Sequence, residues 1–338
     1  MICIDGSQGE GGGQVLRSAL GLSLVTGRPF EIRHIRARRP RPGLRRQHLM
    51  AVRAAATIGT ARVSGDHLGS TRLRFEPAEV TPGQYHFAIG TAGSTTLVLQ
   101  TVLPALILAG GPSRLRLEGG THNPGAPPFD FIALTFLPLL ERMGPRVAAR
   151  LRHAGFYPAG GGQLEVDVTP ADGPLRPLTL LDRGRLRALR GVALVTGLPR
   201  SIAQRELAVL GRELGVDAAA LEIAEPPQAR GPGNVVLVEV QCSALTEVFT
   251  AFGRRGLPAE RVAQDVCGAV RAYLDSPAAC DEHLSDQLLI PLALSGGGAL
   301  RTTTLSSHAA TNMEVIRKFL DVEFEVTAAD GCTIRVRT

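Results

Sequence analysis

Apolar and polar positions follow the same order three times along this chain. In the first copy, the apolar run Ile2 to Ile4 leads into a glycine-rich turn, and the apolar spacing then predicts a helix that ends near Val25. Alternating residues from Phe30 to Ile35 predict a strand. A polar loop follows, and the copy closes with a predicted helix over 47–56 and another strand.

The second and third copies keep this order. In the second, which opens at Ala92, we predict a helix to residue 108, a strand over 115–118, a loop over 119–128 and a helix over 131–143. In the third, which opens at Ser285, we predict a helix to residue 294, a strand over 300–305, a loop over 306–311, a helix to residue 320 and a strand over 322–326. The first two copies begin about 80 residues apart, which is too long for a solenoid repeat and typical of α/β modules around one axis. Equivalent loops of such modules are expected to lie close together.

Residues 183–277 interrupt the repeats, between the second and third copies, with a pattern of their own. The apolar spacing predicts strands over 191–195 and 234–242, helices over 201–214 and 258–274, and a turn over 226–233. We therefore expect a mixed α/β protein with two units. Residues 1–182 and 278–338 form a large domain of three repeats, and residues 183–277 form a small inserted α/β domain in which nothing resembles a reaction centre.

The composition indicates a globular protein of a reducing compartment. The chain has 338 residues, enough for a large core and more than one unit. It contains no apolar run near the roughly 20 residues of a membrane helix, and its first residues lack the basic and apolar regions of a signal peptide. The five cysteines form no C-x-x-C pair, which argues against a zinc site or a disulfide framework. We expect a soluble, cytoplasmic protein without a membrane partner.

The basic residues are almost all arginines. The net charge is +6, and Lys318 is the single lysine among 37 basic residues. It lies in a helix-like surface pattern, so a lysine nucleophile of the K-x-D-G type, which common nucleotidyl-transferring ligases use, is not available. Covalent nucleotide chemistry in this chain would need a different nucleophile.

The glycine-rich turn between Asp5 and Arg17 is the first candidate site. A strand that breaks into glycines and then begins a helix presents free backbone N–H groups at the positive end of the helix dipole, which favours an anion. Glu10 and Gln14 lie in this turn, so a carboxylate is available where a metal–phosphate group could bind. The spacing fits neither G-x-G-x-x-G nor the P-loop pattern. A purely structural role for the glycines is the alternative.

The polar loop of the first copy contains six arginines between Ile35 and His48. Proline and glycine keep the loop irregular, and a cluster of guanidinium groups of this kind binds phosphate bidentately. A solvated basic loop in an arginine-rich protein is the alternative. Because the chain has no tryptophan and only three tyrosines, stacking along a nucleic acid strand is not supported. Contact with one end of a nucleic acid fits better.

The equivalent loop of the second copy has the character of a pocket wall. Residues 119–131 are rich in proline and glycine and have apolar edges, which suits one side of a purine site. Gln100, in the preceding helix, offers an amide to the same nucleotide. A structural loop shaped by its prolines is an equally open alternative.

The loop of the third copy contains the sharpest chemical candidate, His308. It lies between an alternating strand and a helix, among small residues that leave an imidazole accessible. The neighbouring polar side chains can orient one ring nitrogen and leave the other free as a nucleophile; they are Ser306, Ser307, Thr311 and Asn312. A structural histidine is the alternative.

Taken together, these motifs resemble the RNA 3′-terminal phosphate cyclase family. The motifs are Asp5 to Arg17, the arginine loop ending in Arg46 to Leu49, Gly155 to Gly162, Ser285 to Leu288 and His308 to Asn312. The resemblance extends over essentially the whole chain. It implies a large domain of repeated α/β modules like those of enolpyruvyl transferases, with a small thioredoxin-like insert. It also implies ATP-dependent conversion of an RNA 3′-terminal phosphate to a 2′,3′-cyclic phosphate, through a covalent histidine–AMP and an RNA-(3′)pp(5′)A intermediate.

The resemblance also implies roles for individual residues. His308 falls at the adenylylated histidine, and Glu10 at the ligand of a divalent metal, Mg²⁺ or Mn²⁺. The implied nucleotide contacts are Gln100, Pro127, Pro128, His283, Leu284, Ser285, Asp286 and Gln287. The implied phosphate and RNA contacts are Gln14, Arg17, Arg36, Arg39, Arg41 and Gln47. His283 stands where the family pattern has a tyrosine that stacks on adenine, and an imidazole offers less stacking area.

Two functions from other classes remain as alternatives. An enolpyruvyl transferase shares the modular fold without a covalent nucleotide, but it would be expected to bring lysines to its anionic substrates, and this chain has one lysine. A non-catalytic relative that acts as a scaffold in ribosomal RNA processing would be expected to lack the histidine loop, whereas this chain has both His308 and Glu10.

Overall fold

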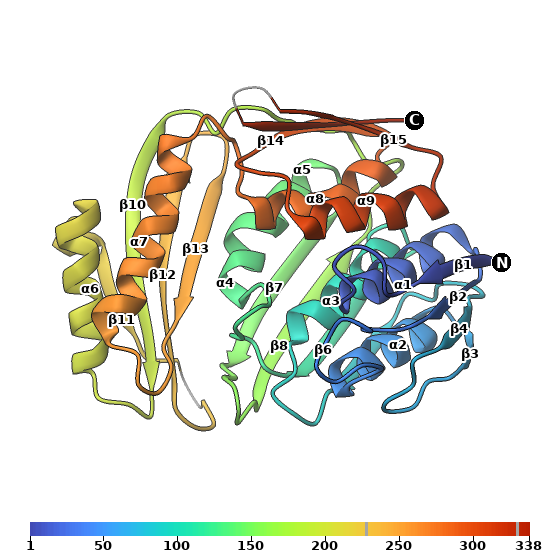
Figure 1. The fold of residues 1–338 in the computed structure, drawn as a ribbon, viewed down its shortest axis with the longest axis horizontal. Coiled ribbons are helices and arrows are strands. Elements are labelled where there is room, and N and C mark those ends of the chain that lie inside the picture. The colour runs from blue at the N-terminus through green and yellow to red at the C-terminus, as the bar shows by residue number, and fades with distance from the viewer. Residues whose placement is uncertain (227–228, 329–330) are drawn as a thin grey trace.

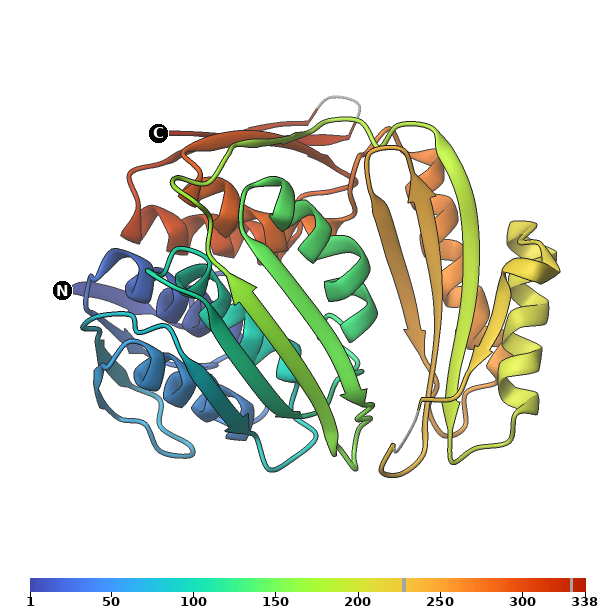
Figure 2. The same cartoon turned by 180° about the vertical axis from the view of Figure 1, so that it is seen from behind.

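Three modules of one topology make up most of the molecule (Figure 1). The computed structural model describes residues 1–226, 229–328 and 331–338. In each module the first and second strands run parallel, and the second and third strands both pair antiparallel with the fourth. The three sheets lie on the outside of the molecule and their helices lie between them, as the two opposite views show (Figures 1 and 2).

The elements of each module occur in the order strand, helix, strand, helix, strand, strand. The first module contains β1 (Ile2–Asp5), α1 (Gln14–Thr26), β2 (Phe30–Arg33), α2 (Arg46–Ile58), β3 (Arg62–Ser64) and β4 (Leu73–Glu76). The second contains β5 (Gln84–Ala88), α3 (Thr95–Leu106), β6 (Ser113–Gly119), α4 (Phe129–Phe131), η1 (Ile132–Phe136), α5 (Leu137–Arg142), β7 (Arg146–His153) and β8 (Gly162–Thr169). The third contains β9 (Leu178–Leu180), α8 (Glu282–Leu294), β14 (Gly297–Thr302), α9 (Ser307–Phe319), β15 (Glu323–Thr327) and β16 (Cys332–Arg337). The expected mixed α/β fold of three repeats is confirmed.

The insert interrupts the third module itself. The short strand β9 pairs parallel with β14, so it is the first strand of the third sheet although it precedes the insert. The sequence interpretation, which placed the insert between the second and third copies, was therefore wrong on this point. A strand of three residues is too short for its alternation to be recognised in the sequence.

The helix predicted over 131–143 is not continuous. A π-helical turn, η1, separates the single turn α4 from α5. Pro138 has no N–H to donate to the carbonyl four residues earlier, so the regular hydrogen-bond ladder cannot pass through this point. The prediction from apolar spacing did not take Pro138 into account, and this proline explains why the helix is interrupted.

The inserted segment forms a sheet of its own. It contains β10 (Leu186–Thr196), α6 (Ser201–Leu214), η2 (Ala218–Ala220), β11 (Leu221–Ala224), β12 (Gly233–Cys242), β13 (Thr246–Phe252) and α7 (Ala259–Asp275). The strand order is β11-β10-β12-β13, with β10 parallel to β11 and β12 antiparallel to both neighbours. This is the arrangement of a thioredoxin-like domain, as expected. The predicted turn over 226–233 includes residues 227 and 228, which lie outside the described residues.

Each face of the insert sheet belongs to a different core. On β10, Val192 and Leu194 pack into the large hydrophobic core of the molecule, whereas Ala193 and Val195 pack with α6 and α7. β12 alternates in the same way, because successive side chains of a strand point to opposite faces. The insert is thus packed against the large domain through part of one face of its sheet.

Polar contacts also join the insert to the large domain. The Arg183 guanidinium donates to the carbonyls of Tyr273, Leu274 and Ala278 at 2.6–2.9 Å, so it ties the entry of the insert to its exit. The buried Glu247 on β13 accepts a hydrogen bond from the backbone of Asp281, which caps α8.

An aromatic contact joins the other end of the insert to the large domain. A Cβ at Gly233 would overlap the ring of Phe156. That ring stacks on His122 with centroids 5.2 Å apart. The insert is therefore held at both ends of its sheet. No helix in the described part of the chain is both long and apolar enough to cross a membrane.

We expect Arg183→Ala to destabilise the fold by about 2 kcal/mol, because carbonyls at the end of α7 lose a charged donor. Urea unfolding followed by circular dichroism measures this difference. Arg187→Ala is the matched control, since Arg187 is an exposed arginine on the same segment. Equal stability of the two variants would contradict a stabilising role for the hydrogen bonds of Arg183.

Candidate active site

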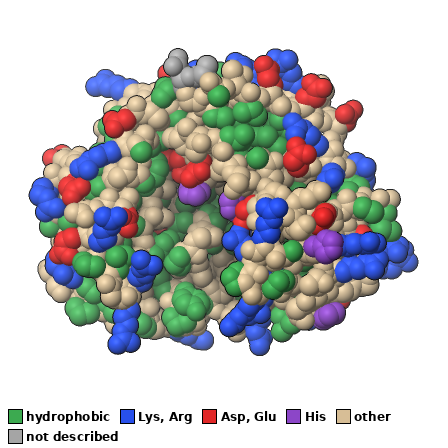
Figure 3. Space-filling view, in the orientation of Figure 1, with side chains coloured by type: hydrophobic (Ala, Val, Ile, Leu, Met, Phe, Trp, Pro, Cys, Tyr) green, Lys and Arg blue, Asp and Glu red, His purple; other side chains and the backbone are tan. Residues whose placement is uncertain are grey.

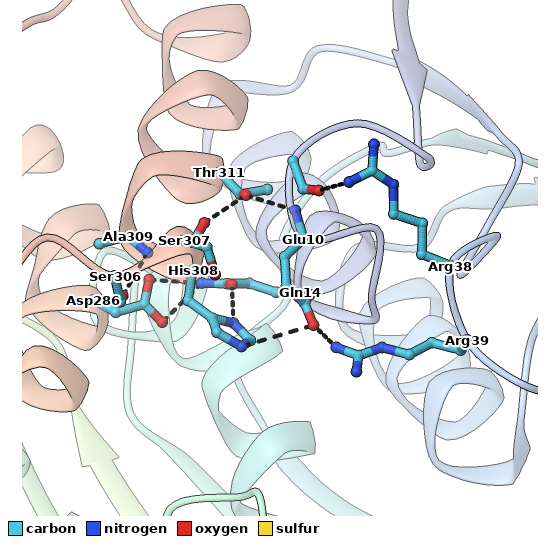
Figure 4. Close-up of polar contacts among 11 residues, drawn as sticks. Glu10, Gln14, Arg38, Arg39, Asp286, Ser306, Ser307, His308, Ala309 and Thr311 are labelled. Atoms are coloured by element: carbon cyan, nitrogen blue, oxygen red, sulfur yellow. Dashed lines mark hydrogen bonds and ion pairs between the residues drawn. The ribbon is translucent and has the colours of Figure 1, made fainter.

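His308 occupies the first turn of α9, where the chain enters from β14. The Ser306 hydroxyl caps this helix by accepting from the Ala309 backbone N–H at 3.1 Å. The imidazole is half exposed and lies beside Gln14 and Glu10 of the glycine-rich turn (Figure 4). The positive end of α9 therefore lies next to the ring, where it favours negative charge.

Gln14, the first residue of α1, fixes the orientation of the His308 ring. Its Oε1 lies 2.6 Å from Nδ1 of His308, and its Nε2 lies 2.6 and 2.8 Å from the two carboxylate oxygens of Asp286 on α8. A carboxylate only accepts, so the amide nitrogen faces Asp286 and the amide oxygen faces His308. Nδ1 must then donate, and Nε2 of a neutral His308 keeps its lone pair.

Asp286 is itself held by buried partners. The Asn312 amide donates to its Oδ1 at 3.0 Å and to its backbone carbonyl at 3.2 Å. The Ser18 hydroxyl donates to the Asn312 side chain at 2.7 Å. Gln14, Ser18, Asp286 and Asn312 are all buried, so His308 lies at the accessible end of a closed hydrogen-bonded chain.

Glu10 lies on the other side of the imidazole. Its Oε1 is 3.7 Å from Nε2 of His308 and forms an ion pair with Arg39, and its backbone N–H donates to Thr311 at 3.0 Å. Apart from the ion pairs of Oε1, neither carboxylate oxygen accepts a hydrogen bond from the described residues. A single carboxylate suits Mg²⁺ or Mn²⁺, which take one or two protein carboxylates together with water and substrate phosphates. Within the described ranges no group of three or more His, Cys, Asp or Glu residues could hold a metal ion by itself.

The glycines of the turn make room for these side chains. A Cβ at Gly12 would overlap the Glu10 carboxylate, and a Cβ at Gly13 would overlap the ring of His48. Gly13 also precedes α1 without a side-chain cap, so the first N–H groups of the helix have no capping side chain. The glycines therefore provide close packing and, at the same time, a helix start without a capping side chain.

The surroundings of His308, above all its burial, favour its neutral form. Burial lowers the pKa of His308, Arg17, Arg39 and His283 lower it further, and Asp286 opposes them. Burial raises the pKa of Asp286, against the hydrogen bonds from Gln14 and Asn312. Burial lowers the pKa of Arg17 to about 10, which leaves it protonated at neutral pH. A neutral imidazole thus lies beside a permanent cation.

A cavity of about 1080 Å³ opens at His308, between the large domain and the insert. Figure 3 shows it as a hollow near the centre of this face. Nine of the residues to which the family resemblance gives roles line it: Gln14, Arg17, Gln100, Pro127, Pro128, His283, Asp286, Gln287 and His308. Ser306, Ser307 and Asn312, the polar neighbours of His308 in the sequence, line it as well. Gln100 and Gln287 are hydrogen-bonded to each other. The cavity is large enough for a nucleotide.

The structure places the other singled-out residues elsewhere. Glu10 and Arg39 lie at the edge of the site, next to His308. Leu284 and Ser285 are buried in α8. Gln47 accepts from the Ser94 backbone N–H at 2.7 Å, and Arg36 donates to carbonyls of its own loop, at Arg41 and Gly43. Arg41 is exposed and does not line the cavity.

The sequence interpretation gave no separate role to His48. This residue is buried under the glycine-rich turn, and its Nδ1 has no hydrogen-bond partner in the described part of the chain. Burial, followed by Arg17, Arg36 and Arg45, lowers the pKa of His48 to about 3. Its place directly after Gln47 in α2 was visible, but its contact with a turn 35 residues earlier was not.

The fold and this cluster are typical of an enzyme that acts on a phosphorylated substrate. The family model described as "RNA 3′-terminal phosphate cyclase" matches residues 8–326. The chain therefore belongs to the RNA 3′-terminal phosphate cyclase family, and it is an enzyme of that family.

Curated relatives cover nearly the whole chain. The RNA 3′-terminal phosphate cyclase of Koribacter versatilis is 53% identical over 98% of this chain and 93% of its own. The cyclase of Ectopseudomonas mendocina is 51% identical over 96% of this chain and 95% of its own. The cyclase of Ralstonia nicotianae is 50% identical over 99% of this chain and 96% of its own. Among solved structures, the enolpyruvyl transferase NikO from Streptomyces tendae is 12% identical, with 99% of this chain and 65% of that chain covered and a TM-score of 0.28. A likeness that weak carries no argument.

The buried His48 predicts a loss of stability in acid. Its pKa is about 3 in the folded protein and 6.5 in the unfolded chain, so the unfolded chain binds the extra proton between these values. Stability is fully present above pH 6.5 and falls as the pH decreases. From pH 6.5 to pH 5 the loss due to this group is roughly 1.5–2 kcal/mol.

Urea unfolding at several pH values tests this expectation. His48→Gln should show a shallower decrease between pH 6.5 and pH 5 than the wild type, whatever its stability at pH 7. His67→Gln replaces an exposed histidine and should keep the wild-type slope. Parallel curves for wild type and His48→Gln would contradict the buried neutral imidazole.

Proposed function

We propose that this enzyme converts an RNA 3′-terminal phosphate to a 2′,3′-cyclic phosphate and consumes ATP through a covalent histidine–AMP. The names of its relatives support the overall reaction. The observation that carries the covalent step is the hydrogen bond from Nδ1 of His308 to Gln14, because it leaves Nε2 free to attack. The absence of any lysine except Lys318 agrees with a histidine nucleophile. A cytoplasmic location stays a prediction.

In the first step Nε2 of neutral His308 attacks the α-phosphorus of ATP. An N–P bond forms, the bond to the β-phosphate oxygen breaks, and pyrophosphate leaves. The adenylylated ring is cationic, and its Nδ1–H still donates a hydrogen bond to the amide oxygen of Gln14. Arg17 and Arg39 lie beside His308, where they offset charge on the phosphates. A divalent ion held by Glu10 would supply further positive charge at the leaving pyrophosphate.

The next two steps use the RNA itself. An oxygen of the 3′-terminal phosphate attacks the phosphorus on His308, the N–P bond breaks, and RNA-(3′)pp(5′)A forms. The adjacent 2′-hydroxyl then attacks the 3′-phosphorus, AMP leaves, and the hydroxyl proton is released to solvent. This closure is intramolecular and has a high effective molarity, so it needs little help from a base.

Replacement of the nucleophile gives the direct test. With ATP labelled at the α-phosphate and Mg²⁺ or Mn²⁺, the wild type should acquire label that is stable in alkali and lost in acid, as expected for an N–P bond. His308→Ala should acquire none, while its circular dichroism spectrum stays that of the wild type. His283→Ala is the matched variant, since residue 283 is another histidine of the cavity; it should still reach full labelling at saturating ATP. Labelling of His308→Ala would disprove the assignment.

Gln14 is expected to act as a positioning residue. Gln14→Met keeps the size of the side chain and removes its hydrogen bonds to His308 and Asp286, so labelling at saturating ATP should slow roughly 10- to 100-fold, the range found for residues that orient a metal-binding histidine. The ATP concentration for half-maximal rate should change little. Gln14→Glu places a carboxylate next to Nδ1 of His308, and this negative charge raises the pKa of the imidazole. The acid limb of the pH–rate profile of this variant should therefore move to higher pH.

The sequence interpretation assigned Gln14 to the phosphate or RNA instead. If Gln14→Met labels at the wild-type rate but requires much more RNA for cyclisation, that earlier assignment is correct and the positioning role is not. Ser18→Ala, at the far end of the hydrogen-bonded chain, serves as control and should have a smaller effect than Gln14→Met.

A further inference from the structure

One wall of the active-site cavity comes from the inserted domain. The residues of this insert wall are Thr250, Phe252, Arg254, Leu257 and Ala269, from the end of β13, the following turn and α7. They line the same cavity as His308. The sequence gave no reason to place any part of the insert in a reaction site.

The large-domain side already provides for one nucleoside. Pro127 and Pro128 line the cavity together with His283 and the hydrogen-bonded amides of Gln100 and Gln287. This set combines apolar surface, an aromatic ring and polar groups, as a nucleotide pocket requires. It leaves the insert wall without an assigned ligand.

The chemistry of the insert wall suits a second nucleotide. Phe252 is only half buried, and Arg254 is exposed, with no ion pair or side-chain hydrogen bond among the described residues. The nearby Asp265, which also lines the cavity, is paired with Arg261 at 3.0 Å. An aromatic ring next to an unpaired arginine is the combination that holds a base and a phosphate of a single strand.

The wall is held in place from behind. Gly253 donates its N–H to the Asn234 carbonyl at 3.1 Å, and a Cβ at Gly253 would overlap the Asn234 side chain. The Asn234 amide donates to the buried Glu206 at 2.9 Å. Buried polar contacts of this kind fix the turn between Phe252 and Arg254. The position of both side chains is thus part of the fold of the insert.

Geometry of the reaction also requires a second nucleoside close to His308. The acceptor phosphate must reach the phosphorus on Nε2 of His308, and the last nucleoside of the RNA is bonded to that phosphate. We infer that the insert wall binds this last nucleotide, with the Phe252 ring against its base and the Arg254 guanidinium at the phosphate that joins it to the preceding nucleotide. The inference rests on the proposed function.

The test uses a short oligoribonucleotide with a 3′-phosphate, together with ATP. Phe252→Leu keeps the apolar packing and removes the aromatic face. The RNA concentration for half-maximal cyclisation should rise roughly five- to tenfold, as for the loss of one base–aromatic contact. Arg254→Ala should raise it similarly and should weaken its dependence on salt. Labelling of the enzyme by ATP alone should be unchanged in both variants.

Two controls separate a contact with RNA from a change in structure. Arg255→Ala removes the neighbouring exposed arginine, which does not line the cavity, and should leave RNA binding unchanged. An oligoribonucleotide whose last nucleotide lacks its base should bind more weakly to the wild type, and Phe252→Leu should then cost nothing more. Such a cycle isolates the contact between the ring and the base.

The outcomes are distinct. An equal penalty for Phe252→Leu with the normal and the base-less RNA, or no penalty with either, would overturn the inference. A loss of ATP labelling in Phe252→Leu or Arg254→Ala would also overturn it, because the wall would then belong to the ATP pocket. Failure of the wild type to label or to cyclise would instead disprove the proposed function.

Discussion

The hydrogen-bonded bridge from His308 through Gln14 to Asp286 is the constraint on which the rest of the site depends. Its members come from the starts of α9, α1 and α8 and are 272 and 294 residues apart in sequence. A buried amide or carboxylate without its partner is costly, so the bridge is stable only when all three helices begin at one point. The outer sheets serve this requirement, because each one sets where its own helices start.

The insert acts on the same point through α8. It leaves the third module after β9 and returns just before Asp281, which caps α8, five residues before Asp286. The hydrogen bond between Glu247 and the Asp281 backbone lies where the chain re-enters the large domain, and so do the hydrogen bonds of Arg183. A shift of the insert would therefore move the helix that holds the carboxylate and, at the same time, the wall of the cavity.

The sequence was most informative where an element buries one regular face. The helix over 201–214 has the bounds expected from its apolar spacing, and the three repeats and a separate inserted α/β segment follow from the same kind of pattern. The thioredoxin-like arrangement of the insert was implied only by the family resemblance. The sequence was least informative for short elements such as β9, and for the helix that Pro138 interrupts. Residue chemistry identified His308 and Glu10 as candidates, and the family resemblance added Asp286. Neither could show that Gln14 joins two of them, because that contact exists only after distant modules have packed.

The neutral amide between Asp286 and His308 resolves a conflict in the chemistry of the site. A nucleophilic imidazole must be oriented, and a carboxylate orients it well, but a carboxylate in direct contact would also stabilise the imidazolium, which cannot attack. With Gln14 between them, Nδ1 is held by an uncharged oxygen while the charge of Asp286 lies one side chain further away. The carboxylate of Glu10, 3.7 Å from Nε2, is paired with Arg39. Burial and the neighbouring arginines then outweigh the remaining attraction of Asp286, and the pKa of His308 lies below its usual value. A direct pair of carboxylate and imidazole would orient the ring but would also favour its protonation. The Gln14 amide orients the His308 ring and allows it to stay neutral.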